Sequence, residues 1–249
     1  MRFNSLRMNT TKLSVNINKI ATLRNARGHN TPNVVEWAME IERFGANGIT
    51  VHPRPDERHI TRRDVHELKK VVTTEFNVEG YPTRDFLDLV IRVLPHQVTL
   101  VPDPPEAITS NAGWDVQTHA SFLSDIVHEL RASGIRTSIF LNPEPSQLEA
   151  VLQVGPDRIE LYTEPYAANY ATDRERAIVP FAETARLASE MGIGVNAGHD
   201  LSLENLEFFA ARIPSLLEVS IGHALISDAL RYGMENTVRL YQRCLQPKG

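Results

Sequence analysis

The sequence contains a single cysteine and no long apolar run. Because Cys244 is the only cysteine, no disulfide can form within the chain, and a zinc site built from cysteines is excluded. The first residues lack the apolar core of a signal peptide, and no later segment approaches the roughly 18 to 20 apolar residues of a membrane span. We therefore expect a soluble protein of a reducing compartment, the cytoplasm, with no membrane partner.

An excess of positive charge is also missing. The formal net charge is -5 at pH 7 and no sustained run of Lys or Arg occurs, which argues against a nucleic-acid partner. A small anionic substrate is still compatible with this total, because binding depends on local charge. No G-x-G-x-x-G turn follows the first strand-like segment, and this absence disfavours a dinucleotide-binding fold.

Short β-branched runs alternate with longer helical patterns about eight times along the chain. The predicted strands are 12–17, 48–52, 75–79, 97–101, 136–141, 158–162, 194–197 and 217–221. One intervening helix is expected to have Thr31 as N-cap and Pro32 as its first residue, and to end at Gly45. Pro180 is expected to start or kink another helix after the polar residues 171–176.

Eight βα units in 249 residues, with no break in composition, predict an α/β fold of the (β/α)8 TIM-barrel type. We expect one domain over residues 12–249, and a flexible leader over residues 1–11. Met8 is a candidate alternative start. The segments 102–118 and 163–174 are longer than a minimal βα loop, so they are candidate lids.

In a TIM barrel, catalytic groups lie where the strands run out into the βα loops. The residues at these eight places are unusually polar. They are Asn16, Asn18, Lys19, His52, Arg54, Glu79, Asp103, Thr109, Asn142, Glu160, Thr163, Asn196, His199, Gly222 and His223.

Two of these segments carry the residue types that move protons. Thr50 and His52 share one side of the second strand, and the loop after it brings Arg54, Arg58 and His59. The third strand ends with Glu79, whose pKa would rise on burial into the range useful for proton transfer. The other interpretations are a solvated basic loop and a carboxylate paired with a neighbouring cation.

The segments VNAGHDLS and VSIGHALIS each end a strand with a glycine and a histidine before a helical pattern. Loops after strands seven and eight of such barrels commonly hold phosphate at a helix N-terminus, so we expect a phosphorylated substrate. Lys19, Arg24 and Arg27 follow the first strand and are candidates for a second phosphate. The alternative is a basic turn on the surface.

The chain resembles the pyridoxine 5'-phosphate synthase family of one vitamin B6 pathway. The resemblance runs in order from about residue 13 to residue 240, through VNINKIATLRNARG, GITVHPRPDERHITRRDV, FNVEG, LVPD, IELYT, VNAGHDL and IGHALI. It implies a TIM barrel with extra helices, a homo-octamer in the cytoplasm, and a transferase that needs no metal or organic cofactor. It also implies condensation of 1-deoxy-D-xylulose 5-phosphate with 3-amino-2-oxopropyl phosphate to pyridoxine 5'-phosphate, phosphate and water.

The same resemblance assigns residues to roles. It places His52, Glu79 and His199 at acid/base positions, and Glu160 in a supporting position. The substrate-binding set is Asn16, Asn18, Lys19, Arg27, Arg54, His59, Thr109, Asp200, Gly222 and His223. The chain departs from the family pattern at Asn18 and Lys19, where many members have Asp-His, and at Asp200, which can be Gly.

Two rival functions remain open at this point. One is a metal-dependent sugar-phosphate aldolase or epimerase on the same fold, because His52, His199, His223 and Glu79 are all residue types that ligate divalent ions. The other is a protein that binds phosphorylated ligands without turnover. Measurements of metal content and of product formation would distinguish these two functions from the synthase.

Overall fold

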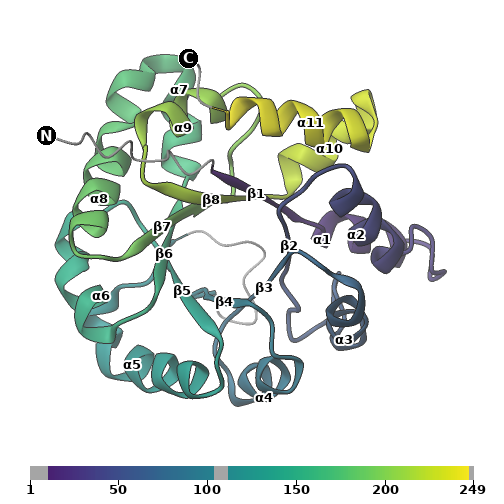
Figure 1. The fold of residues 1–249 in the computed structure, drawn as a ribbon, viewed down its shortest axis with the longest axis horizontal. Helices are drawn as coiled ribbons and strands as arrows, with labels where there is room; N and C mark the ends of the chain where they lie inside the picture. Colours follow the sequence, from purple (N-terminus) through teal and green to yellow (C-terminus); the bar gives the residue numbers. More distant parts are fainter. Residues whose placement is uncertain (1–10, 104–111, 247–249) are drawn as a thin grey trace, which may run out of the picture.

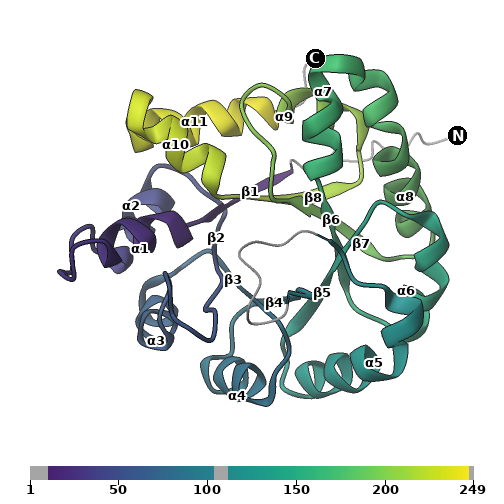
Figure 2. The same ribbon diagram turned by 180° about the vertical axis from the view of Figure 1, so that it is seen from behind.

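The computed structural model describes residues 11–103 and 112–246, and in it eight parallel strands close into a barrel in the order β1 to β8 (Figures 1 and 2). The strands are β1 (Lys12–Asn16), β2 (Gly48–Val51), β3 (Glu75–Gly80), β4 (Gln97–Leu100), β5 (Arg136–Leu141), β6 (Arg158–Tyr162), β7 (Gly194–Gly198) and β8 (Leu216–Ile221). The predicted barrel is therefore confirmed, and each predicted strand agrees with an observed one to within one residue at either end.

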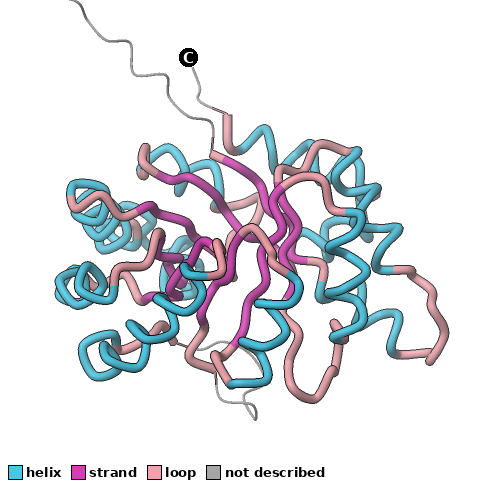
Figure 3. The backbone as a smooth tube through the Cα atoms, turned by 60° about the horizontal axis from the view of Figure 1, so that its bottom comes forward, coloured by secondary structure: helices cyan, strands magenta, loops and turns pink. Residues whose placement is uncertain are grey.

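Helices surround the barrel on its outside (Figure 3). They are α1 (Asn18–Asn25), α2 (Val34–Arg43), α3 (Arg62–Val71), α4 (Arg84–Val93), α5 (Val116–Ala132), α6 (Leu148–Val154), α7 (Glu164–Ala177), α8 (Val179–Glu190), α9 (Leu206–Arg212), α10 (His223–Tyr232) and α11 (Met234–Cys244), with a short 3-10 helix η1 (Pro145–Gln147) before α6. Among the residues that the structure describes, no helix is long and apolar enough to cross a membrane.

The strands alternate between an apolar outer face and a polar inner face. Val15, Ile49 and Val78 are fully buried members of the core under the helices. The residues between them point inward, as shown by the hydrogen bond from Thr99 on β4 to Glu160 on β6, which passes over the intervening β5. TIM-barrel interiors are usually filled by bulky branched side chains. Here polar side chains also occupy inward positions away from the strand ends, and Phe140 contributes an apolar one.

Two expectations about helices are wrong. Helix α2 is capped by Asn33 instead of Thr31, because the Asn33 side chain accepts hydrogen bonds from the backbone N–H groups of Val35 and Glu36 at 2.9 and 3.2 Å. The candidate lid at 163–174 is helical, since α7 begins at Glu164 with Pro165 in its first turn. Pro180 does lie at the start of α8, as predicted.

The expected N-terminal leader and the candidate lid at 102–118 lie partly outside the described residues. Residues 1–10 of the expected leader lie there, whereas Thr11 donates a hydrogen bond to the carbonyl of Leu216 at 2.9 Å and so is already attached to the barrel. Of the candidate lid 102–118, residues 104–111 lie outside the description, and Thr109 is among them.

Candidate active site

The carboxyl ends of the strands bring the predicted acid/base residues to one mouth of the barrel. His52 follows β2, Glu79 lies near the end of β3, and His199 follows β7. Because the barrel is closed and all of its strands are parallel, residues far apart in sequence share this mouth. The site is thus assembled from single residues on several strands.

Glu79 is a half-buried carboxyl group at the mouth of the barrel. Burial raises the pKa of Glu79 well above its ordinary range, the nearby Glu160 and Asp103 carboxylates raise it further, and the Arg54 guanidinium lowers it. The Asn16 amide donates to its Oε2 at 3.4 Å. The raised pKa favours the protonated form of this carboxyl, and that form can deliver a proton to a substrate.

His52 is shifted in the opposite sense. Burial lowers the pKa of His52 well below its usual value, and the positive charges of Arg54, His59 and Arg58 add to the effect. Its backbone N–H donates to the Asn18 side chain at 2.9 Å, which gives Asn18 a role in holding the loop. At neutral pH the imidazole of His52 is therefore uncharged and able to accept a proton.

His59 lies close to His52, with ring centroids 6.4 Å apart. Burial, together with Arg54, Lys19 and Arg58, lowers the pKa of His59 to about 4. Its Nδ1 accepts the backbone N–H of Ile60 at 2.9 Å. The ring is therefore a neutral group at physiological pH, and Nε2 is the nitrogen left to meet a ligand.

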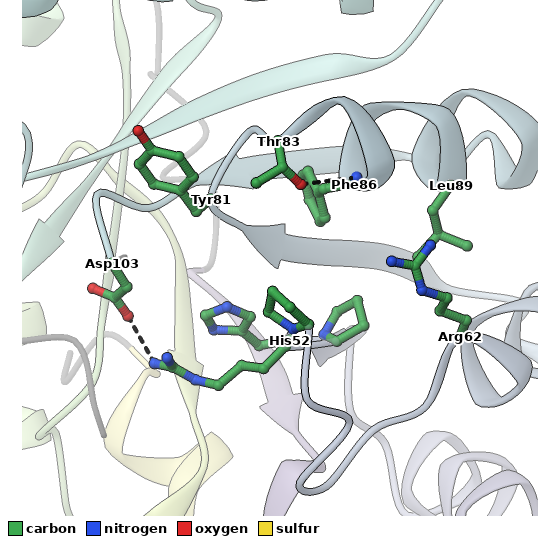
Figure 4. A pocket seen from close by; sticks show the side chains of 10 residues that line it. His52, Arg62, Tyr81, Thr83, Phe86, Leu89 and Asp103 are labelled. Carbon is green, nitrogen blue, oxygen red and sulfur yellow. Dashed lines mark hydrogen bonds and ion pairs between the residues drawn. The ribbon is translucent and has the colours of Figure 1, made fainter. Parts of the chain in front are cut away.

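Arg54 and Asp103 form a buried ion pair beside His52. The guanidinium donates to the carboxylate at 2.9 Å, and both side chains are almost completely buried. Figure 4 shows Asp103 and Tyr81 on one side of a small hollow and Arg62 on the other, with His52 between them. The cavity of this hollow has a volume of about 30 Å³. The pair fixes Arg54 at the mouth, where its charge faces both His52 and Glu79.

Glu160 ends a hydrogen-bonded line of polar side chains across the barrel interior. Ser14 and Thr50 are 2.7 Å apart, Asn77 reaches Thr50 at 3.4 Å, and Thr99 donates to Asn77 at 3.1 Å. Burial raises the pKa of Glu160 to about 7, although the Thr99 hydrogen bond and the charge of His199 lower it. Glu79 and Glu160 are thus neighbouring carboxyl groups, and the charge of Glu160 raises the pKa of Glu79.

Gly198 gives Glu160 the space that it occupies. A Cβ on Gly198 would lie 2.3 Å from Oε1 of Glu160 and 3.1 Å from the Ser220 carbonyl. We expect Gly198→Ala to displace the carboxylate by about 1 Å and to lower turnover by about 10- to 10²-fold. Steady-state kinetics would check this. Wild-type turnover in a folded variant would show that the position of Glu160 is irrelevant to the reaction.

The segment after β7 carries His199 in a left-handed backbone conformation, with φ of 98°. Its Nδ1 lies 2.5 Å from Oδ2 of Asp200, and the ring of Tyr162 meets it edge-on with centroids 5.3 Å apart. The backbone N–H of Asp200 donates to the buried Thr163 hydroxyl. Asp200 was expected to contact substrate, and the structure gives its carboxylate a partner within the protein.

Strand β8 delivers its glycine and histidine as predicted. Gly222 is the N-cap of α10, and His223 is the exposed first residue of that helix. A Cβ on Gly222 would come within 3.1 Å of the Asn16 side chain, so a larger residue would crowd β1. The N-terminus of α10 therefore opens at the same mouth as Asn16, where its N–H groups suit an anionic group.

The basic residues after β1 separate into two kinds. Lys19 and Arg27 are exposed and so accessible to a ligand. Arg24 is buried, and it donates to both carboxylate oxygens of Asp64 at 2.6 and 2.8 Å and to the carbonyl of His59 at 3.0 Å. The expectation that Arg24 neutralises a phosphate is wrong, because its guanidinium already serves an internal carboxylate.

Other predicted strand-end residues have structural partners. Asn142 accepts the backbone N–H of Gly113 at 2.9 Å, and Asn196 accepts from Arg158 at 3.2 Å within the barrel. Sequence reasoning did not single out Tyr162 or Thr99. The two-residue alternation that placed Glu160 inside could have indicated both, since Tyr162 is two residues further on the same face.

The described part of the chain contains no group of three or more His, Cys, Asp or Glu side chains placed to hold a metal ion. His52, His199, His223 and Glu79 are therefore not gathered into such a cluster. Within the mouth, the pKa of His52 is lowered and the pKa of Glu79 is raised, so the first favours its neutral form and the second its protonated form. That arrangement suits general acid/base chemistry.

Comparison with known proteins identifies the family of this chain. Residues 13–247 match the family model described as pyridoxal phosphate biosynthesis protein PdxJ. The chain is 59% identical over 236 residues to a pyridoxine 5'-phosphate synthase of Bacteroides thetaiotaomicron, covering 95% of this chain and all of that protein. It is 60% identical over 235 residues to the enzyme of the same name from Parabacteroides distasonis, covering 94% and 99%.

Solved structures of lower identity share the fold. A thiamine phosphate pyrophosphorylase from Pyrococcus furiosus superposes with a TM-score of 0.61 at 13% identity, covering 96% of both chains. A phosphoribosylanthranilate isomerase from Thermotoga maritima superposes with a TM-score of 0.58, also at 13% identity, over 94% of this chain and 98% of that one. These likenesses concern the barrel alone.

Proposed function

The chain belongs to the PdxJ family of pyridoxine 5'-phosphate synthases, and we propose that it makes pyridoxine 5'-phosphate by moving protons between His52, Glu79 and His199. The observation that carries the proposal is the pairing of opposite environments at the mouth. Burial lowers the pKa of His52, which favours its uncharged form, and raises the pKa of Glu79, which favours its protonated form. One group is thus ready to accept a proton and the other to donate one.

The proposed substrates are 1-deoxy-D-xylulose 5-phosphate and 3-amino-2-oxopropyl phosphate. Joining an amine to a ketone, expelling water and phosphate, and aromatising the ring all require proton transfers between fixed groups. The second substrate supplies the amine, so no lysine nucleophile is needed. Each well-placed acid or base contributes typically about 10²- to 10⁴-fold in rate, and orientation of two anchored substrates contributes further.

Positive and dipolar groups around the mouth support binding of two phosphorylated substrates. The N-terminus of α10 at Gly222 and His223 suits one phosphate. We assign contacts with the substrates to Arg54, His59 and Asn16 at the mouth, and to the exposed Lys19 and Arg27 on the side of α1. Thr109, which lies outside the described residues, completes the proposed set.

The remaining roles follow the same logic. We propose that Glu160 supports the acid/base residues, because its carboxyl neighbours both Glu79 and His199. Asn18 holds the loop after β2 through His52.

A cytoplasmic location and a homo-octamer belong to the same proposal. Leu23 on α1, Met39 on α2 and Leu230 on α10 are exposed apolar side chains suited to contacts between subunits.

The decisive experiment uses chelator-treated protein with both substrates, following pyridoxine 5'-phosphate and released phosphate together. We expect equal amounts of the two products without added metal. Activity restored only by a divalent ion would favour the rival metal-dependent aldolase or epimerase chemistry. Binding of either substrate without product would favour a protein that binds phosphorylated ligands without turnover.

A further inference from the structure

The backbone on both sides of His199 is fixed by one buried hydroxyl group. The Thr163 side chain donates to the carbonyl of Gly198 at 2.7 Å and accepts the backbone N–H of Asp200 at 3.1 Å. Asn205 donates to the carbonyl of Asp200 at 3.3 Å. Left-handed backbone is unfavourable for a residue with a Cβ, so these bonds explain how His199 keeps that conformation.

The same conformation turns the two neighbouring side chains toward each other. Oδ2 of Asp200 lies 2.5 Å from Nδ1 of His199. Both side chains are about one third exposed, at 31% and 37%, so they lie at the edge of the mouth where substrate can reach the ring. The Tyr162 ring meets the imidazole edge-on and limits its rotation.

We propose that Asp200 is a positioning residue for His199: its carboxylate accepts the Nδ1–H and leaves Nε2 as the nitrogen that exchanges protons with the substrate. This inference rests on the proposed function, in which His199 is an acid/base residue. The proton on Nδ1 stays between the two side chains. A proton taken from substrate is held on Nε2 and returned from there, while Asp200 remains ionised throughout.

Charge explains why a carboxylate fits this place. The titratable groups that face His199 are Glu160 and Tyr162 on β6 and Asp200 on its own segment. Once Nε2 takes a proton, the ring is cationic, and the Asp200 carboxylate stabilises that cation. Because the Asp200 carboxylate faces the imidazole ring, it does not face the substrate phosphate. An acidic residue at this position is therefore compatible with an anionic substrate.

The test compares Asp200→Asn with Glu204→Gln, an exposed acid of the same loop that matches the loss of charge. We expect Asp200→Asn to lower kcat about 10-fold, which is less than the loss from removing an acid/base group itself, with KM changed by no more than about twofold. Glu204→Gln should leave both constants unchanged. Asp200→Ser provides a second uncharged variant if the Asn variant folds poorly.

A spectroscopic measurement distinguishes a role of Asp200 in positioning the His199 ring from a purely structural role. Long-range ¹⁵N–¹H spectra of histidine-labelled protein at about pH 8.5, where an ordinary imidazole is neutral, report which nitrogen carries the proton. The His199 signals are assigned by their loss in His199→Gln. We expect an Nδ1–H ring in the wild type and a mixture with the Nε2–H form in Asp200→Asn.

The outcomes distinguish this inference from the proposed function. Unchanged kcat and an unchanged ring tautomer in Asp200→Asn, with an active wild type, would overturn the positioning role and leave the synthase function intact. A rise in KM with kcat unchanged would show that Asp200 acts on the bound substrate, which also overturns the inference. An inactive wild type with the His199 tautomer as expected would count against the function alone.

Discussion

Glu79→Gln should lower turnover by at least about 10²-fold while the protein stays folded. The raised pKa of Glu79 favours its protonated form, so Gln reproduces its shape and hydrogen-bonding groups but cannot transfer a proton. Its pKa is raised by burial first, and by Glu160 and Asp103 next. Steady-state formation of pyridoxine 5'-phosphate by the variant and the wild type measures the effect.

The stability of the same variant provides an internal control. Because the pKa of Glu79 is higher in the folded than in the unfolded chain, its ionisation destabilises the fold as the pH rises above about 4.3, the ordinary value for Glu. Glu79→Gln removes that penalty, so its free energy of unfolding near neutral pH should equal or exceed that of the wild type. Near-wild-type turnover would remove Glu79 from the mechanism.

A matched substitution elsewhere on the barrel excludes a general effect of losing one acidic residue. Glu149 is exposed in the first turn of α6 and is not among the predicted site residues. Glu149→Gln should leave turnover unchanged. If both variants lost activity equally, the loss would not be specific to Glu79, and the proton-transfer role of Glu79 would be wrong.

Much of the barrel could be predicted because its strands are short β-branched runs and because glycine and proline mark the ends of its helices. The mouth residues follow once the strand order is known, since a parallel barrel carries every strand end to one side. His52, Glu79 and His199 could therefore be placed at the mouth without knowledge of any side-chain contact. Asn33 was missed because Thr31 and Asn33 both favour N-caps, and only the backbone geometry chooses between them.

The contacts within the site could not be predicted, because they depend on register and on side-chain direction. Arg24 and Lys19 both follow β1 and look equally available in the sequence, yet helix α1 turns Arg24 inward toward Asp64 and Lys19 outward. Asp200 looked unfavourable for phosphate because sequence gives no direction for its carboxylate. The left-handed backbone at His199 sets that direction.

Arg24→Met should destabilise the protein by about 3 kcal/mol at neutral pH, because it leaves the Asp64 carboxylate buried without its cation. The two side chains are only 10% and 11% exposed, and Arg24 makes both hydrogen bonds of a bidentate pair. Asp64 keeps the backbone N–H and hydroxyl of Thr61 at 2.8 and 2.9 Å, which limits the loss. Urea unfolding measures the change.

The effect should shrink in acid. Burial alone would raise the pKa of Asp64, but hydrogen bonds from Arg24 and Thr61 and the charge of Arg24 hold it below its ordinary value. The pair therefore stabilises the fold above about pH 4, the pKa of Asp in an unfolded chain, and that contribution is lost as the pH falls through the lower folded value. Wild type and Arg24→Met should converge in stability there.

Arg43→Met is the matched control, since Arg43 pairs with Glu40 on the surface of α2 with side chains 70% and 42% exposed. Exposed pairs contribute about 0 to 1 kcal/mol, so this variant should unfold almost as the wild type does. A cost for Arg24→Met no larger than that of Arg43→Met would contradict the proposed burial. The double variant with Asp64→Asn should cost less than the two single changes added together, because each then removes the partner that the other leaves unpaired.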